Sequence, residues 1–186
     1  MSQAARLSKA ANFLAAHESA FRSAGGTIEQ SMRASATQLM REVEAHPAWA
    51  DKAHIHHEGL MMMWEASLAS ADERDQVLVA RLDGQLVAAL ALRPHKSFWV
   101  VASIGSTGML RGAGPSLEME AVRRAAAAGV GIKAEWTDKS RSYHLALGRT
   151  LEGRLAFWTA SAVSQLATAK QVKLGGLPLR PMPTII

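Results

Sequence analysis

The stretch GMLRGAGPSLEMEAV, residues 108–122, joins a strongly apolar run to a helical pattern. Before it, residues 98–104 (FWVVASI) are apolar on both faces, which is typical of a strand at the centre of a sheet. After it, residues 115–128 place Pro115 near the first turn and Gly129 beyond the last, the usual asymmetry of a helix. A glycine-bearing turn at a helix N-terminus can also bind phosphate through backbone N–H groups. The stretch therefore predicts a strand, a turn and a helix, and the turn is either an anion site or an ordinary connection.

The segments around this joint predict further strands and helices. Strands over 76–82 and 85–92 flank Asp83-Gly84, which is a two-residue hairpin signal. Strands are also expected at 131–136 and 151–160, and helices at 140–147 and 161–170. This order predicts an α+β domain with one mixed sheet and flanking helices over residues 71–170.

The residues before and after this domain have different patterns. Residues 1–70 indicate helices over 3–23, 27–44 and 52–70, and the second has Thr27 and Gln30 in capping-box positions. We therefore expect a wholly helical N-terminal segment. Residues 171–186 include LGGLPLRPMPTII, which has too many Gly and Pro residues for regular structure, so an extended C-terminal arm is expected.

The order of elements from residue 76 to residue 150 resembles the GNAT superfamily of acetyl-CoA-dependent N-acetyltransferases. The phosphate-binding signature of that family is Gln/Arg-x-x-Gly-x-Gly/Ala, and residues 111–116 (RGAGPS) are similar to it, with Ser116 in the last place. The second half of the family has a strand, a helix carrying a Tyr, and a Leu-Gly pair. Here these are GIKAEW, SRSYHLALG and Leu147-Gly148. The resemblance implies a GNAT-like fold and transfer of an acetyl group from acetyl-CoA, as cosubstrate, to an unidentified amine.

The resemblance also implies which residues bind acetyl-CoA. The phosphates would be bound at the start of the helix, and a backbone N–H of the central strand would meet the tetrahedral oxyanion. The residues at the helix start are Arg111, Gly112, Ala113, Gly114 and Ser116, and those on the strand run from Ala102 to Ile104.

Acetyl transfer needs an acid for the departing thiolate and a base for the incoming ammonium. Tyr143, the single tyrosine of the chain, is the expected acid, with His144 as the second choice. Glu135 and Glu65 are the candidate bases. Each of these residues has a plain structural alternative: a tyrosine ring packed in the core, or a carboxylate on the surface.

Three features depart from the family pattern. Pro115 has no N–H to offer to a phosphate. Counting back from Leu147-Gly148 places His144 where the family has its Tyr, while Tyr143 lies one residue earlier and about 100° around the helix. The family also begins with a strand, whereas this chain is predicted to begin with helices.

A second resemblance is to the GNAT-like internal virion proteins of short-tailed phages, on the segments FWVV, EWTDKS and YHLALG. It implies a different function, in which the fold is a catalytically inactive part of a larger assembly such as a phage particle. The C-terminal arm would then contact neighbouring proteins, and homo-oligomers are a further option.

The composition limits the remaining possibilities. The chain is 48% apolar and has a net charge of +5. Because it has no Cys, it can form no disulfide and has no Cys nucleophile. It also has no apolar run long enough for a membrane span. No dense basic or RNP-like motif is present, so nucleic acid is not an expected partner. We expect a cytoplasmic protein, or one packaged within a phage particle.

Two clusters near residue 60 have simple explanations. His54, His57 and Glu58 share a helix face but lack the His-Glu-x-x-His order of zinc peptidases, so solvated histidines are favoured and no metal is expected. Residues 61–64 (MMMW) could line an acceptor pocket, but core packing is the favoured interpretation.

Overall fold

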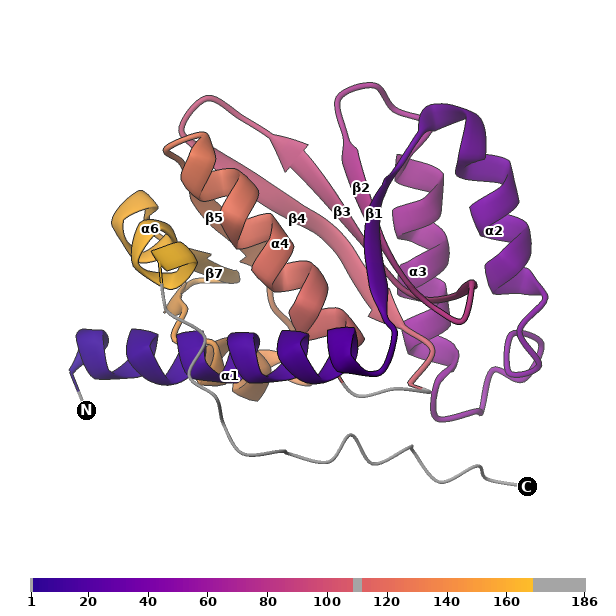
Figure 1. Cartoon of the computed structure of the whole chain (residues 1–186), viewed down its shortest axis with the longest axis horizontal. Helices are drawn as coiled ribbons and strands as arrows, with labels where there is room; N and C mark the ends of the chain where they lie inside the picture. Colours follow the sequence, from indigo (N-terminus) through magenta and orange to yellow (C-terminus); the bar gives the residue numbers. More distant parts are fainter. Residues whose placement is uncertain (1, 109–111, 169–186) are drawn as a thin grey trace.

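A mixed sheet forms the centre of the molecule in the computed structural model, which describes residues 2–108 and 112–168 (Figure 1). The strand order is β1-β2-β3-β4-β5-β7-β6. Among the described residues β4 and β5 form the parallel pair, and the other neighbours are antiparallel. The strands are β1 Thr27–Ser31, β2 Gln76–Leu82, β3 Gln85–Pro94, β4 Phe98–Ser106, β5 Gly131–Glu135, β6 Thr150–Glu152 and β7 Leu155–Trp158.

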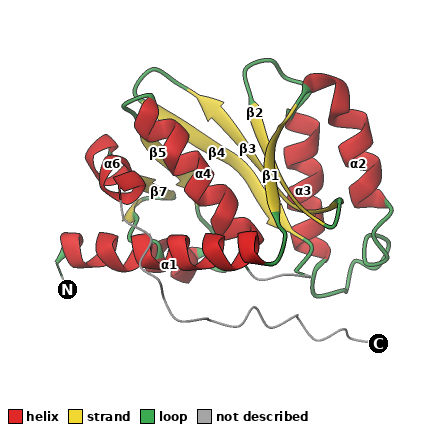
Figure 2. Ribbon diagram, in the orientation of Figure 1, coloured by secondary structure: helices red, strands yellow, loops and turns green. Residues whose placement is uncertain are grey.

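Helices cover both faces of this sheet (Figure 2). They are α1 Gln3–Ser23, α2 Ala36–Glu44, α3 His57–Ala69, α4 Ala113–Ala127, α5 Arg141–Ala146 and α6 Ala160–Thr168, with a 3₁₀ turn, η1, at Arg33–Ser35. One core lies between the sheet and α1, α4 and α6, and the other between the sheet and α2 and α3. Successive residues of β3 alternate between them: Leu90 and Leu92 belong to the first core, and Ala89 and Ala91 to the second. Burial on both faces explains why β3 has no polar alternation.

The prediction of a wholly helical N-terminal segment is wrong at Thr27–Ser31. These residues form β1, which pairs antiparallel with β2 at the edge of the sheet. Ile28 packs against the first core, and Glu29 accepts a hydrogen bond from Arg81 of β2 at 2.9 Å. The pairing satisfies backbone groups along the outer edge of β2, and this gain from a distant strand overrides the local capping-box pattern. Elements from before and after residue 70 thus share one sheet and the same two cores.

Most other predicted elements are confirmed, with changes at their ends. The helix over 3–23 is α1, the hairpin around Asp83-Gly84 is β2–β3, and the central strand is β4. The strand expected over 151–160 is instead the short hairpin β6–β7, followed by α6. The predicted arm, residues 171–186, lies outside the described residues.

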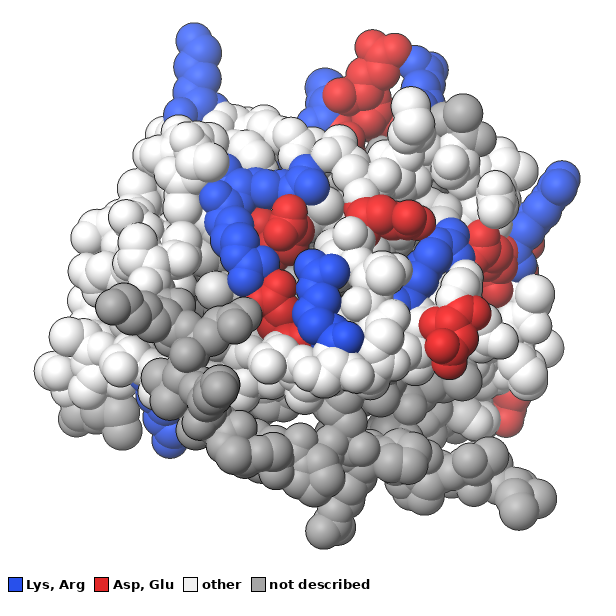
Figure 3. Space-filling model, viewed as in Figure 1, with Lys and Arg blue, Asp and Glu red and all other residues white. Residues whose placement is uncertain are grey.

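On the face formed by α1 and α4, the basic and acidic side chains of the described residues are intermixed (Figure 3). Arg123 donates to the buried Glu18 at 2.8 Å, and Arg124 donates to Glu120 at 2.9 Å. Basic and acidic side chains therefore alternate on this face and largely neutralise one another.

Candidate functional site

The two parallel strands β4 and β5 separate in the middle of the sheet. They are paired from Phe98 opposite Gly131 to Val101 opposite Ala134, and β5 ends one residue later, at Glu135. β4 continues to Ser106, and beyond Val101 it pairs with β3 alone among the described strands. The edge of β4 that would have faced β5 is thus open from Ala102 onward, and its backbone groups are left for a ligand or water.

A β-bulge lies at the point of separation. Ala91 of β3 is opposite Ser103 and Leu92 is opposite Val101, so Ala102 has no partner on β3. A bulge bends its strand and redirects the neighbouring backbone, and such bulges are frequent beside active sites. The predicted oxyanion-binding segment, Ala102 to Ile104, begins at this bulge.

The turn before α4 requires a glycine. Gly112 caps α4 in a left-handed conformation (φ 105°), and a Cβ added there would lie 2.9 Å from the carbonyl oxygen of His17. Residues with side chains are strained in that conformation, and α1 passes too close to leave room for one. Figure 1 shows α1 crossing this end of α4.

The first turn of α4 has few donors to offer. Pro115 has no N–H, and both the N–H and the hydroxyl of Ser116 bond to the carbonyl oxygen of Gly112, at 2.9 and 2.6 Å. Ser116 therefore has no donor left for a phosphate in the predicted way. The N–H groups of Ala113 and Gly114 have no acceptor within the helix. Arg111 lies outside the described residues.

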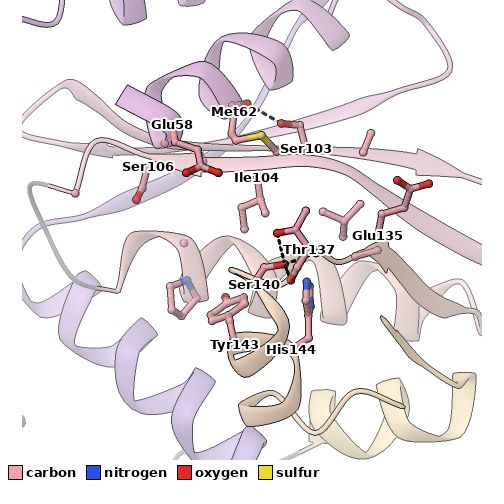
Figure 4. Close-up of a pocket in the computed structure, with 18 of the residues that line it drawn as sticks. Glu58, Met62, Ser103, Ile104, Ser106, Glu135, Thr137, Ser140, Tyr143 and His144 are labelled. Carbon is pink, nitrogen blue, oxygen red and sulfur yellow. Dashed lines mark hydrogen bonds between the residues drawn. The ribbon is translucent and has the colours of Figure 1, made fainter. Parts of the chain in front are cut away.

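A cavity of about 1160 Å³ lies beside the open edge of β4 (Figure 4). Its walls come from β4, the end of β5, α3, α5 and the start of α4, with His17 of α1 closing one side. Gly114, at the start of α4, lines the cavity, and a Cβ added to it would meet nothing within 4 Å. The cavity thus connects the bulge on β4 to the N-terminus of α4.

Tyr143 and His144 point from α5 toward β4 in this cavity (Figure 4). Their rings meet edge to face, with centroids 5.8 Å apart. Within residues 2–108 and 112–168, the Tyr143 hydroxyl has no hydrogen-bond partner, and burial, followed by the charge of Glu118, raises its pKa above the ordinary value. The hydroxyl therefore stays protonated at neutral pH.

His144 is held from behind by two buried charged residues. Arg149 donates from Nη1 to Nδ1 of His144 at 2.7 Å, and from Nη2 to Oε2 of Glu118 at 2.6 Å. The side chains of Arg149 and Glu118 are both 0% exposed. Burial, followed by the positive charge of Arg149, lowers the pKa of His144 to about 4.

Solved structures of acetyltransferases share the overall fold of this chain. An aminoglycoside 6'-acetyltransferase type Ii superposes with a TM-score of 0.50 at 12% identity, over 72% of this chain and 97% of that one. A GCN5-related N-acetyltransferase from Rhodopseudomonas palustris superposes with a TM-score of 0.50 at 13% identity, over 72% of this chain and 94% of that one. The chain has the GNAT fold. 

The other comparisons gave a structural match with a lower TM-score and no match to the sequence. A GNAT family acetyltransferase from Brucella melitensis, solved in complex with acetyl-CoA, is similar at a TM-score of 0.48 and 18% identity, over 72% of this chain and 87% of that one. No protein-family model and no curated protein matches the sequence. At these identities the structural similarity establishes the GNAT fold and leaves the chemistry to the residues of the site.

The GNAT fold brings one of the two predicted bases to the cavity. Glu135, at the end of β5, lines the cavity. Glu65 of α3 is exposed and lies outside the residues that line it. Glu58, in the first turn of α3, lines it instead, and its carboxylate contacts Lys139 at 2.9 Å. Glu58 and Glu65 are seven residues apart and so lie on the same face of α3, about two turns from each other.

The histidines before α3 form no metal site with three ligands. The rings of His54 and His56 lie 5.3 Å apart, and burial, followed by the charge of His54, lowers the pKa of His56. In the part of the chain that the structure describes, no group of three or more His, Asp or Glu side chains is arranged to hold a metal ion. None of the helices described there is long and apolar enough to cross a membrane.

Proposed function

We propose that this protein transfers an acetyl group from acetyl-CoA to an amine. The observation that carries the proposal is that one cavity joins the bulged, unpaired edge of β4 to the start of α4 and to Tyr143. Acyl transfer from a thioester needs these three parts together: backbone donors for an oxyanion, a site for an anionic carrier, and a proton donor for sulfur. The GNAT fold supports the same reaction class by analogy.

The start of α4 would bind the phosphates of acetyl-CoA. The positive end of the helix dipole lies there, and the N–H groups of Ala113 and Gly114 have no acceptor within the helix. Gly114 leaves open space where any other residue would place a Cβ. Arg111 precedes this turn in the sequence and would add a charge-assisted contact.

The acetyl group would lie against the bulge on β4. The amine nitrogen, once neutral, attacks the thioester carbon, so a C–N bond forms and the carbonyl oxygen becomes an oxyanion. Backbone N–H groups between Ala102 and Ile104 would stabilise that oxyanion. The C–S bond then breaks, sulfur takes a proton from Tyr143, and Tyr143 regains one from solvent while the nitrogen loses its extra proton.

Two carboxylates indicate what kind of amine would enter. Glu58 of α3 and Glu135 of β5 both line the cavity. An acceptor that arrives as an ammonium is attracted by these charges, and either carboxylate is a candidate to accept its proton. The proposal is therefore for a cationic amine, with Glu135 as one of two possible bases.

Calorimetry with acetyl-CoA tests the proposal. We expect the wild-type protein to bind acetyl-CoA and the Gly114→Glu variant to lose binding, because the new carboxylate would fill the cavity wall and repel the phosphates. Ala127→Glu is the matched control, since it adds the same charge at an exposed position at the far end of α4. Loss of binding in both variants, or no binding by the wild type, would refute the site. The latter result would leave the non-catalytic alternative, a GNAT-fold part of a larger assembly such as a phage particle.

A further inference from the structure

The buried ion pair between Glu118 and Arg149 lies behind the cavity and has no role in the mechanism above. Glu118 comes from the second turn of α4, Arg149 follows α5, and the guanidinium also stacks on the ring of Trp158, 4.1 Å from its centroid. Buried ion pairs seldom stabilise a fold more than well-packed apolar residues would. Here Oε1 of Glu118 and Nε of Arg149 are also buried without a partner among the described residues. A pair this costly calls for an explanation other than stability.

The contact with His144 supplies one. An arginine guanidinium has N–H donors and no acceptor, so Nδ1 of His144 must accept the bond and cannot carry a proton. The proton of the neutral imidazole is therefore on Nε2. This nitrogen has no partner among the described residues and is not one of the buried unpartnered atoms, and His144 lines the cavity. Nε2–H is thus open to the cavity.

We propose that Glu118 and Arg149 are positioning residues that hold His144 as a neutral imidazole whose Nε2–H donates a hydrogen bond to charge developing on the reacting thioester. The assignment rests on the proposed acetyl transfer. It separates the roles of two adjacent residues: Tyr143 transfers a proton to sulfur, and His144 stabilises charge without giving up its proton.

The chemistry of a neutral imidazole supports this separation. Giving up the Nε2 proton would leave an imidazolate anion in a buried site, and forming an anion away from water is costly. The low pKa of His144 keeps the ring neutral throughout the neutral range. A fixed neutral imidazole acts as an electrophile toward a carbonyl, as a preorganised donor that costs no reorganisation during the reaction.

His144→Asn tests the role of Nε2 in turnover. Asparagine keeps an oxygen near the position of Nδ1, so Arg149 retains an acceptor, but the donor at Nε2 is lost. We expect kcat to fall by about 10²-fold, as when one oxyanion donor is removed, with little change in the KM for acetyl-CoA. A kcat close to that of the wild type would overturn the assignment. A large rise in the KM for acetyl-CoA would also overturn it. Such a rise would mean that His144 acts in substrate binding, whereas a donor that acts in the transition state changes kcat and leaves KM nearly unchanged.

Nuclear magnetic resonance of the imidazole nitrogens tests the positioning without any activity. In the wild type we expect His144 to have unprotonated Nδ1 and protonated Nε2, and to titrate near pH 4. Arg149→Lys should preserve this signature, because an ammonium also only donates. The paired variant Glu118→Leu/Arg149→Met, which avoids a lone buried charge, should raise the pKa of His144 partway toward its ordinary value, because the charge of Arg149 is removed while burial, the larger cause, remains. Protonated Nδ1 in the wild type, or an unchanged pKa in the paired variant, would overturn the positioning role.

The two readouts separate this inference from the proposed function. If the wild type shows no turnover with any amine but His144 has the expected nitrogen signature, the acetyl-transfer proposal fails and the catalytic role of His144 fails with it. If turnover occurs and the signature is absent, acetyl transfer stands and the positioning role of Glu118 and Arg149 is refuted.

Discussion

Replacing His144 by Asn is expected to make the folded protein less sensitive to acid. In the folded state burial and Arg149 lower the pKa of His144 from 6.5 to about 4. Between these two pH values the unfolded chain binds the proton more tightly than the folded one, so stability falls as pH falls through this window. Each pKa unit corresponds to about 1.4 kcal/mol, which gives a full penalty of about 3 kcal/mol below the folded pKa. About 2 kcal/mol of it is expected to develop between about pH 7.5 and about pH 5.

Urea unfolding at a series of pH values measures this effect. The wild type should lose about 2 kcal/mol more than His144→Asn over that interval, because asparagine does not titrate. Other histidines, such as His46, contribute equally to both proteins and cancel in the difference. Tyr143→Phe is the matched control on the same helix and should keep the pH dependence of the wild type. Identical pH dependence in the wild type and His144→Asn would show that His144 is not held neutral by its surroundings.

Three further predictions concern stability. Glu118→Leu alone should cost about 3–5 kcal/mol because it leaves Arg149 charged and unpaired, whereas Glu118→Leu/Arg149→Met should stay close to the wild type; equal losses in denaturant unfolding would contradict this. Gly105→Ala should lower the free energy of unfolding by about 1–3 kcal/mol, since its Cβ would lie 2.2 Å from the carbonyl oxygen of Gly59 and push α3 away from β4; an unchanged melting temperature would show that these elements are not so closely packed. Lys139→Ala removes an exposed ion pair with Glu58 and should change the free energy of unfolding by less than about 1 kcal/mol; a larger loss in the same assay would mean that the pair is structural.

Much of the site lies on segments that the sequence could locate. Ala102, Gly114, Glu135, Tyr143 and His144 all lie at the cavity, because each belongs to an element with a clear local pattern and the order of those elements resembles a known fold. Other details of the turn could not be seen in the sequence. Ser116 uses both donors on Gly112, a back-bond that sequence spacing does not reveal.

Glu118 and Arg149 could not have been found in this way. They lie 31 residues apart, and nothing in the sequence around either one marks it as buried. A glutamate in an amphipathic helix and an arginine after a Leu-Gly pair are both expected on the surface. Their contact exists only because α4 and the segment after α5 pack behind the same cavity.

The sequence by itself determined the features that depend on neighbouring residues. The β2–β3 hairpin follows from Asp83 and Gly84, which take the positive φ angles (50° and 77°) that such a turn requires. The central strand and the helix after it follow in the same way from apolar periodicity and from Pro and Gly at the helix ends. Tertiary structure alone decided that Thr27–Ser31 is a strand, because a β-strand is completed by the hydrogen bonds of a partner, here β2, that comes much later in the chain. It also decided the charge state of His144, since burial and the neighbouring guanidinium, which set that pKa, exist only after folding.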